Sequence, residues 1–224
     1  FKGKNLIVIQ VESLENGLIG LEYEGQEITP NINRLLDRSL YFSQVVEQVK
    51  DGNSSDAELL FNASLYPVAS GSAFLRFGEN TYPAMPGILA RSGYTSIAIH
   101  GDDKEYWNRD VVFSQMGFDR YIDETQFDEQ LLQNGPKVGM GILDEILFEQ
   151  SLREIRQLPE PFNAFIITIT SHMPFTMPPA YQYLDLSRAD RTADYLQSIR
   201  YVDEAFGSFY RQLEAEGLLK DSVL

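Results

Sequence analysis

The sequence lacks cysteine altogether, which excludes disulfide bridges, thiolate metal sites and a cysteine nucleophile. Long apolar runs are also missing. The longest, Leu6–Val11 and Phe162–Thr170, fall far short of the roughly 18 residues that a membrane-spanning helix needs. The chain starts at Phe1 without a methionine or a signal-peptide pattern, so we expect it to be an excised piece of a longer protein.

Basic residues are scarce as well. The chain has 18 Lys and Arg against 33 Asp and Glu, a net charge of -15, which excludes a general nucleic-acid-binding surface. An acidic protein that handles an anionic substrate needs a local positive centre, such as a metal ion, an arginine or a helix N-terminus. A functional site for an anion must therefore contain one of these three.

The apolar segments indicate the fold. No linker or repeat divides the 224 residues, of which 43% are hydrophobic, so we expect a single domain over residues 1–224. Short apolar runs alternate with segments of helical period, which predicts an α/β fold with a mostly parallel sheet sandwiched by helices. The expected strands are Asn5–Val11, Tyr94–Ile99 and Asn163–Thr170, with further strands over Tyr41–Gln48 and within Leu218–Leu224. The expected helices are Pro30–Ser39, Ser55–Ser64, Ala84–Arg91, Gly141–Leu158 and Ala193–Glu216.

Polar residues follow three of the expected strands at the point where each ends. Glu12 follows the first strand, while His100 and His172, the two histidines of the chain, follow the next two. The carboxyl ends of parallel strands meet at one edge of a sheet, where open α/β folds build active sites. Although a single His or Glu at a strand end is more often an ordinary loop residue, the three together predict a site at this edge.

A polar loop, Asp51–Glu58, runs directly into an apolar helix. A serine hydroxyl held there would lie near the positive end of the helix dipole, where an alkoxide or a phosphoryl oxygen is stabilised. The alternative is an ordinary cap, with Ser54 or Ser55 at the N-cap and Asp56 and Glu58 as first-turn acids. A nucleophilic serine also needs an activator, which a divalent cation bound by Glu12 can provide.

The segment His100–Arg109 gathers the only tryptophan, a histidine, a lysine and an arginine just after a strand, a composition that suits a polyol phosphate. Arg109 can grip phosphate oxygens, Trp107 can cover a sugar-like face, and His100 and Asp102 can bond to hydroxyl groups. The alternative is that Trp107 packs into the core while Arg109 pairs with a neighbouring aspartate on the surface.

A fourth segment, Thr170–Pro178, places His172 on a loop that contains two prolines. There His172 can donate to phosphate or act as a general acid toward a leaving group. A packed loop with a satisfied histidine is an equally good interpretation of this segment alone.

Together these residues resemble the extracellular catalytic domain of the lipoteichoic acid synthase and phosphoglycerol transferase family, within the alkaline phosphatase and sulfatase superfamily. The matching segments occur in family order and span almost the whole chain. They are Asn5–Ser13, Gly52–Glu58, Ser64–Pro67, His100–Asp102 with Trp107–Arg109, and Ser171–Phe175.

The resemblance implies a role for each matched position. Glu12 corresponds to a metal-binding glutamate, and Ser54 to the nucleophile that also ligates the metal, where the synthases carry threonine. The positions that shape the glycerol-phosphate pocket correspond to His100, Asp102, Trp107, Arg109 and His172. The implied cofactor is Mn or Mg, with the remaining Asp and His ligands after Leu224, so we expect this chain alone to bind metal poorly and to be inactive.

The implied function is metal-dependent transfer of phosphoglycerol from a lipid-borne donor resembling phosphatidylglycerol, through a covalent serine intermediate, to a polyol or glycan acceptor of the cell envelope. The parent protein is expected to be anchored at the extracellular face of a bacterial cell membrane by helices that precede Phe1. The alternatives are a phosphodiesterase, phosphatase or sulfuric ester hydrolase of the same superfamily, and a non-catalytic polymer-binding domain. No C/S-x-P-x-R motif surrounds Ser54, which disfavours sulfatase chemistry.

Overall fold

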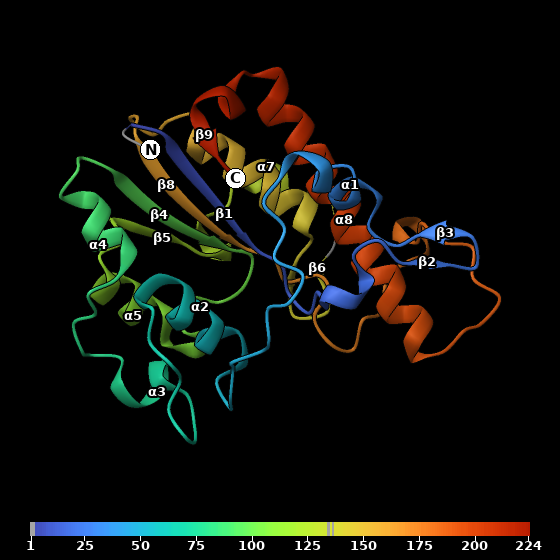
Figure 1. Ribbon diagram of the computed structural model, residues 1–224, viewed down its shortest axis with the longest axis horizontal. Helices are drawn as coiled ribbons and strands as arrows, with labels where there is room; N and C mark the ends of the chain where they lie inside the picture. The colour runs from blue at the N-terminus through green and yellow to red at the C-terminus, as the bar shows by residue number, and fades with distance from the viewer. Residues whose placement is uncertain (1–2, 134, 136) are drawn as a thin grey trace.

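The computed structural model of the protein describes residues 3–133, 135 and 137–224, and its centre is a five-stranded parallel sheet (Figure 1). The strands lie in the order β5–β4–β8–β1–β9. Their bounds are Asn5–Gln10 for β1, Thr95–His100 for β4, Arg120–Ile122 for β5, Phe162–Ile167 for β8 and Ser222–Val223 for β9. Every neighbouring pair is parallel, which confirms the predicted sheet.

Helices cover both faces of the sheet, because successive strand residues point to opposite sides. Ile97 and Ile99 of β4 pack with helices α7 and α8, whereas Ala98 between them packs with α2, α3 and α5 on the other side. The helices are α1 Pro30–Asn33, α2 Asn53–Ala63, α3 Ala73–Phe77, α4 Met85–Ala90, α5 Arg109–Met116, α6 Glu129–Leu132, α7 Asp144–Ile155 and α8 Arg191–Ala215. The predicted sandwich is therefore confirmed.

Two small hairpins and several single turns of 3-10 helix complete the described structure. The hairpins pair β2 Glu22–Tyr23 with β3 Gln26–Glu27, and β6 Lys137–Val138 with β7 Gly141–Ile142. The 3-10 turns are η1 Asn16–Leu18, η2 Leu36–Arg38, η3 Tyr106–Asn108, η4 Glu124–Gln126, η5 Pro179–Tyr181 and η6 Leu218–Asp221. Among the described residues, no helix is long and apolar enough to cross a membrane.

The predicted strand over Tyr41–Gln48 is wrong. These residues form no regular element, and Phe42, Val45 and Val46 each expose more than two thirds of their surface. A β-strand needs a partner for its backbone groups, and no described strand lies along this segment.

The expected helices needed smaller corrections. The segment Pro30–Ser39 is divided into α1 and the turn η2, and α7 begins at Asp144 because Gly141–Ile142 belong to the hairpin strand β7. The expected strand near the end of the chain is confirmed as β9, which pairs with the beginning of β1. The prediction that this strand is buried is wrong, because Val223 is 37% exposed.

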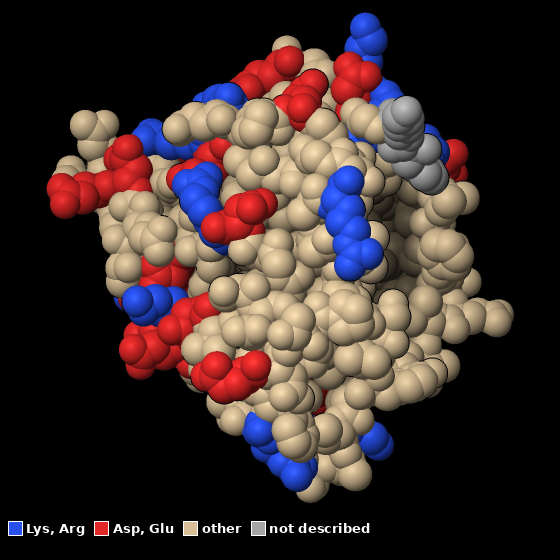
Figure 2. All heavy atoms as spheres, turned by 90° about the vertical axis from the view of Figure 1, so that its left-hand side faces the viewer, with Lys and Arg blue, Asp and Glu red and all other residues tan. Residues whose placement is uncertain are grey.

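Surface charge is unevenly distributed. Between residues 59 and 101 only Arg76, Glu79 and Arg91 are charged, and this segment supplies α3 and α4. Figure 2 shows the side of the molecule where these helices lie, covered mostly by uncharged atoms with charged side chains scattered among them. The whole excess of acidic residues therefore lies in the rest of the chain.

Candidate active site

The register of the sheet brings the predicted site residues to one edge. Gln10 of β1 and His100 of β4 both lie opposite Ile167 of β8, so these three strands end level with one another. Glu12 and the loop that carries His172 follow directly from two of these ends. The structure thus places the predicted residues at the carboxyl edge, where α/β folds bind their ligands.

Glu12 and Ser54, which are 42 residues apart in sequence, are in direct contact. The Ser54 Oγ donates to Glu12 Oε2 at 2.9 Å, and the Ser13 Oγ donates to Glu12 Oε1 at 3.0 Å. The backbone of Glu12 is fixed to the end of β8, because its N–H donates to Thr168 Oγ1 at 2.8 Å and its carbonyl accepts from Ser171 Oγ at 2.6 Å. The carboxylate and the hydroxyl therefore form a preorganised pair of oxygen atoms.

Ser54 is free for this contact because another residue caps α2. Gly52 is the N-cap and Ser54 is the second helical residue, so the alternative with Ser54 or Ser55 as N-cap is wrong. The Asp56 carboxylate accepts from the N–H groups of Lys50 at 2.9 Å and Gly52 at 3.1 Å. A Cβ atom at Gly52 would lie 2.2 Å from Asp56 Oδ1, so only glycine allows this tight loop.

Arg109 is buried and pairs with Glu58. Its Nη2 lies 2.7 Å from Glu58 Oε1 and its Nε donates to both carboxylate oxygens at 3.1 Å, with side-chain exposures of 2% and 0%. Burial raises the pKa of Glu58, although the nearby Arg109 charge opposes this shift. Burial alone would lower the pKa of Arg109, but the adjacent Glu58 carboxylate raises it above its usual value. The short bidentate contacts favour a charged pair. The interpretation of Arg109 as a surface partner of a neighbouring aspartate is therefore wrong.

Several buried polar atoms around Arg109 have no partner among the described residues. They are His100 Nε2, Asp102 Oδ2, Arg109 Nη1, Tyr121 OH and Asp123 Oδ2. The His100 Nδ1–H donates to the Ile167 carbonyl at 2.9 Å, and burial, followed by the nearby Arg109 charge, lowers the pKa of His100 to about 3. A neutral imidazole with a free Nε2 is an acceptor for a ligand hydroxyl. Buried polar atoms are rarely left without partners, so this group is suited to a polar ligand or to water.

Burial raises the pKa of two further groups in this cluster. The pKa of the Asp102 carboxyl is raised chiefly by burial, and the pKa of Tyr121 is raised by burial against the opposing effect of Arg109. Sequence reasoning missed Glu58, Tyr121 and Asp123 as members of the site. Tyr121 lies within β5 and Asp123 directly follows it, and this strand of three residues has an apolar pattern too short to recognise.

Trp107, in the turn η3, and His172, on the loop that follows β8, lie beside this cluster. Trp107 packs in part against the core on the α2 and α5 side, and the next residue, Asn108, donates from Nδ2 to the Phe74 carbonyl at 3.1 Å. The His172 Nδ1–H donates to the Met173 carbonyl at 2.8 Å, and the side chain is partly buried. Both residues thus belong to the region where the sequence placed them, and their roles stay predictions.

Asp144, the first residue of α7, holds the start of the loop that carries His172 by hydrogen bonds to its backbone. Its carboxylate accepts from the N–H groups of Ile169 at 2.8 Å and Thr170 at 3.1 Å, and its own N–H donates to Thr170 Oγ1 at 2.9 Å. Burial raises the pKa of Asp144 to about 7, against these hydrogen bonds. Asp144 therefore fixes the end of β8, which in turn fixes the backbone of Glu12.

The pair Glu12 and Ser54 suits part of a site for a divalent cation. Carboxylate and hydroxyl oxygens are the hard ligands that Mg²⁺ and Mn²⁺ prefer. Within the described residues, however, no group of three or more His, Asp or Glu side chains is arranged to hold a metal ion. These two residues therefore supply only some of the ligands that such an ion requires.

Comparison with known proteins identifies relatives over the whole chain. The sulfatase family model matches residues 4–224. The chain is 38% identical to lipoteichoic acid synthase 1 of Bacillus subtilis and 37% identical to lipoteichoic acid synthase of Staphylococcus aureus, in each case over 100% of this chain and 35% of the relative. The chain thus spans about a third of the length of these relatives.

Solved structures show the same fold. The lipoteichoic acid synthase LtaP of Listeria monocytogenes superimposes with a TM-score of 0.91 at 30% identity, over 99% of this chain and 54% of that chain. The phosphoglycerol transferase GacH of Streptococcus pyogenes, solved with sn-glycerol-1-phosphate, has a TM-score of 0.68 at 16% identity, over 95% of this chain and 58% of that chain, and supports the fold alone. The chain belongs to the sulfatase family, and its relatives include lipoteichoic acid synthases.

Proposed function

We propose that the protein containing this chain transfers phosphoglycerol from a lipid-borne glycerol phosphate, such as phosphatidylglycerol, to a polyol or glycan acceptor of the cell envelope. The observation that carries the proposal is the contact of Ser54 with Glu12 at the carboxyl edge of the sheet, in a chain related to lipoteichoic acid synthases. The named activity of these relatives supports transfer of glycerol phosphate. The site geometry supports a serine as the group that receives it.

The chemistry proposed for Ser54 has two steps. In the first, Ser54 Oγ forms a bond to phosphorus, the bond from phosphorus to the lipid alcohol breaks, and the Ser54 proton passes to water on the side that faces Glu12. His172 gives a proton to the departing diacylglycerol. In the second step the acceptor hydroxyl gives its proton to His172 and attacks phosphorus, the bond from phosphorus to Ser54 Oγ breaks, and Ser54 Oγ takes a proton from water. Both His172 and Ser54 thus regain their protons over the cycle.

The remaining residues of the site bind and orient the donor. The free Nη1 of Arg109 is a donor for a phosphate oxygen, and the free Nε2 of His100 is an acceptor for a glycerol hydroxyl. Asp102 lies in the same cluster and can accept from a second hydroxyl, while Trp107 can cover the glycerol carbons. The ion pair with Glu58 holds the Arg109 guanidinium in place, so the donor meets a preorganised group.

The superfamily is generally metal-dependent, and we propose Mn or Mg as the cofactor, held in part by Glu12 and Ser54. A divalent cation at these oxygens would lower the pKa of the Ser54 hydroxyl and offset the negative charge of the phosphate. We further propose that residues 1–224 form a single domain and that the parent protein acts at the extracellular face of a bacterial cell membrane. The family of the relatives supports both statements.

The test is intact mass spectrometry of the full-length gene product that contains this chain, incubated with Mn²⁺ and a phosphatidylglycerol analogue. We expect a mass gain of one phosphoglycerol group, mapped by peptide analysis to Ser54, absent in Ser54→Ala and retained in Ser54→Thr. Ser55→Ala is a matched control, since the Ser55 Oγ donates to the Gly52 carbonyl at 2.8 Å and not to Glu12. Folded, metal-loaded protein without an adduct would contradict the covalent mechanism.

Further assays of the same protein separate the alternatives. A phosphodiesterase or phosphatase of this superfamily would pass the intermediate to water and release free glycerol phosphate in place of extended polymer. A sulfuric ester hydrolase would release sulfate from an aryl sulfate under the same conditions. A non-catalytic polymer-binding domain would bind glycerol-phosphate polymer and form no adduct on Ser54.

A further inference from the structure

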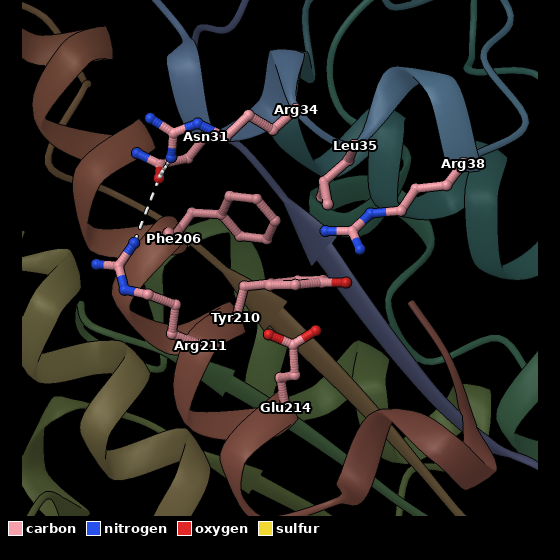
Figure 3. A pocket seen from close by; sticks show the side chains of 9 residues that line it. Asn31, Arg34, Leu35, Arg38, Phe206, Tyr210, Arg211 and Glu214 are labelled. Atoms are coloured by element: carbon pink, nitrogen blue, oxygen red, sulfur yellow. Dashed lines mark hydrogen bonds between the residues drawn. The ribbon is translucent and has the colours of Figure 1, made fainter.

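A cavity of about 140 Å³ opens beside α1, η2 and α8, and it shares no lining residue with the candidate active site (Figure 3). Three arginines and one glutamate line it, together with the rings of Phe206 and Tyr210. The charged residues are Arg34, Arg38, Arg211 and Glu214. The cavity thus has a net charge of two positive units in a chain whose net charge is -15.

Two of the arginines converge on one fixed oxygen atom. Arg34 Nη1 donates to Asn31 Oδ1 at 3.0 Å, and Arg211 Nη1 donates to the same atom at 3.4 Å (Figure 3). Asn31 is itself buried and held by Asp203, whose Oδ2 accepts from the Asn31 N–H at 2.9 Å and from Nδ2 at 2.8 Å. Gly207 allows this approach, because a Cβ atom there would lie 2.3 Å from Asn31 Cγ.

The positive charge of the cavity is not balanced by ion pairs. Within the described part of the chain, none of the three arginines has a carboxylate within 4.0 Å, although acidic residues outnumber basic ones 33 to 18. The nearby Asp203 carboxylate is occupied, since its Oδ1 also accepts from the Ile32 N–H at 2.9 Å. Arg38 lies over the Tyr210 ring, 5.7 Å from its centroid, and is thereby directed across the cavity.

We propose that this cavity binds the phosphate group of a small phosphate monoester or diester. Guanidinium groups offer pairs of N–H donors that match phosphate oxygens, and an anion that binds here relieves the repulsion of positive charges that no ion pair balances. The rings of Phe206 and Tyr210 provide an apolar wall for the carbon part of the ester. The proposal does not rest on the proposed function, because the cavity and the Ser54 site share no residue.

The probe is sn-glycerol 1-phosphate, titrated into the chain at constant ionic strength and followed by calorimetry and by the backbone amide shift of Gly207 in NMR spectra. We expect saturable binding that weakens at least about tenfold in Arg34→Gln/Arg211→Gln. Glu214→Gln removes the only acid of the lining and should tighten binding about threefold. Arg76→Gln/Arg91→Gln is the matched control, since it removes the same charge at two arginines outside the cavity and should leave binding unchanged.

Further measurements distinguish the source of the phosphate group and the role of the active site. Binding to vesicles of phosphatidylglycerol but not to sn-glycerol 1-phosphate, with the same response to the variants, would support the site and assign it to a lipid headgroup. Ser54→Ala should leave the Gly207 shift unchanged, so failure of the proposed catalysis would not affect this result. The proposal is overturned if neither probe binds, if Arg34→Gln/Arg211→Gln and the control behave alike, or if sodium chloride produces the same shift.

Discussion

Replacement of Arg109 by methionine tests the buried ion pair that underlies the candidate site. The substitution keeps much of the side-chain volume but leaves the Glu58 carboxylate, which has an exposed fraction of 0%, without its cation. Removal of one partner from such a pair costs about 3–5 kcal/mol, because the remaining charge must stay buried or take up a proton. This is a large part of the roughly 5–15 kcal/mol that stabilises a typical domain.

The assay is urea unfolding followed by circular dichroism. With a slope of about 2 kcal/mol/M, the unfolding midpoint of Arg109→Met should fall by about 2 M. The double variant Glu58→Met/Arg109→Met removes both charges and should recover most of this loss. The surface pair of Arg156 and Glu216, with exposures of 43% and 32%, is the matched control, and Arg156→Met should cost less than about 1 kcal/mol.

The pH dependence of Arg109→Met follows from the pKa of Glu58. Burial raises this pKa, and without Arg109 nothing comparable opposes the shift. A carboxyl whose folded-state pKa lies above its unfolded value destabilises the protein increasingly as the pH rises through that interval. The loss in Arg109→Met should therefore be smaller at pH 5 than at pH 8. Additive effects of the two single substitutions at pH 8, with a coupling below about 0.5 kcal/mol, would refute the ion-pair reasoning.

Two further substitutions test the local structure. The pKa of Asp144 is raised to about 7 from 3.8, so its ionisation should reduce the free energy of unfolding of the wild type between about pH 4 and pH 7. In Asp144→Asn the free energy of unfolding, measured by urea titration, should depend less on pH across this range. An unchanged pH dependence would contradict the assignment. Gly117 has a φ of +89°, and a Cβ atom there would lie 2.8 Å from Gly87 Cα. We therefore expect Gly117→Ala to reduce the free energy of unfolding by about 1–3 kcal/mol and to lower the melting temperature. Gly93→Ala is the control and should destabilise the protein less, because Gly93 has a similar φ of +82° but open space around it.

The buried strands show how much of the fold can be predicted from sequence. Continuous apolar runs marked β1, β4 and β8, because a strand covered on both faces must be hydrophobic throughout. The same reasoning failed for Tyr41–Gln48, whose composition suits a strand but which has no neighbouring strand among the described residues. It also missed α5, whose eight residues follow the polar segment without a clear apolar period.

The sequence by itself determined the fold class and the edge of the sheet where Glu12, His100 and His172 gather, since local apolar patterns and the residues that follow them are sufficient for both. Only the tertiary structure decided which side chains of the candidate site are in contact. Ser54 meets Glu12 across 42 residues, and Arg109 meets Glu58 across 51. Such contacts depend on strand order, register and helix packing, which bring together residues that no local pattern relates.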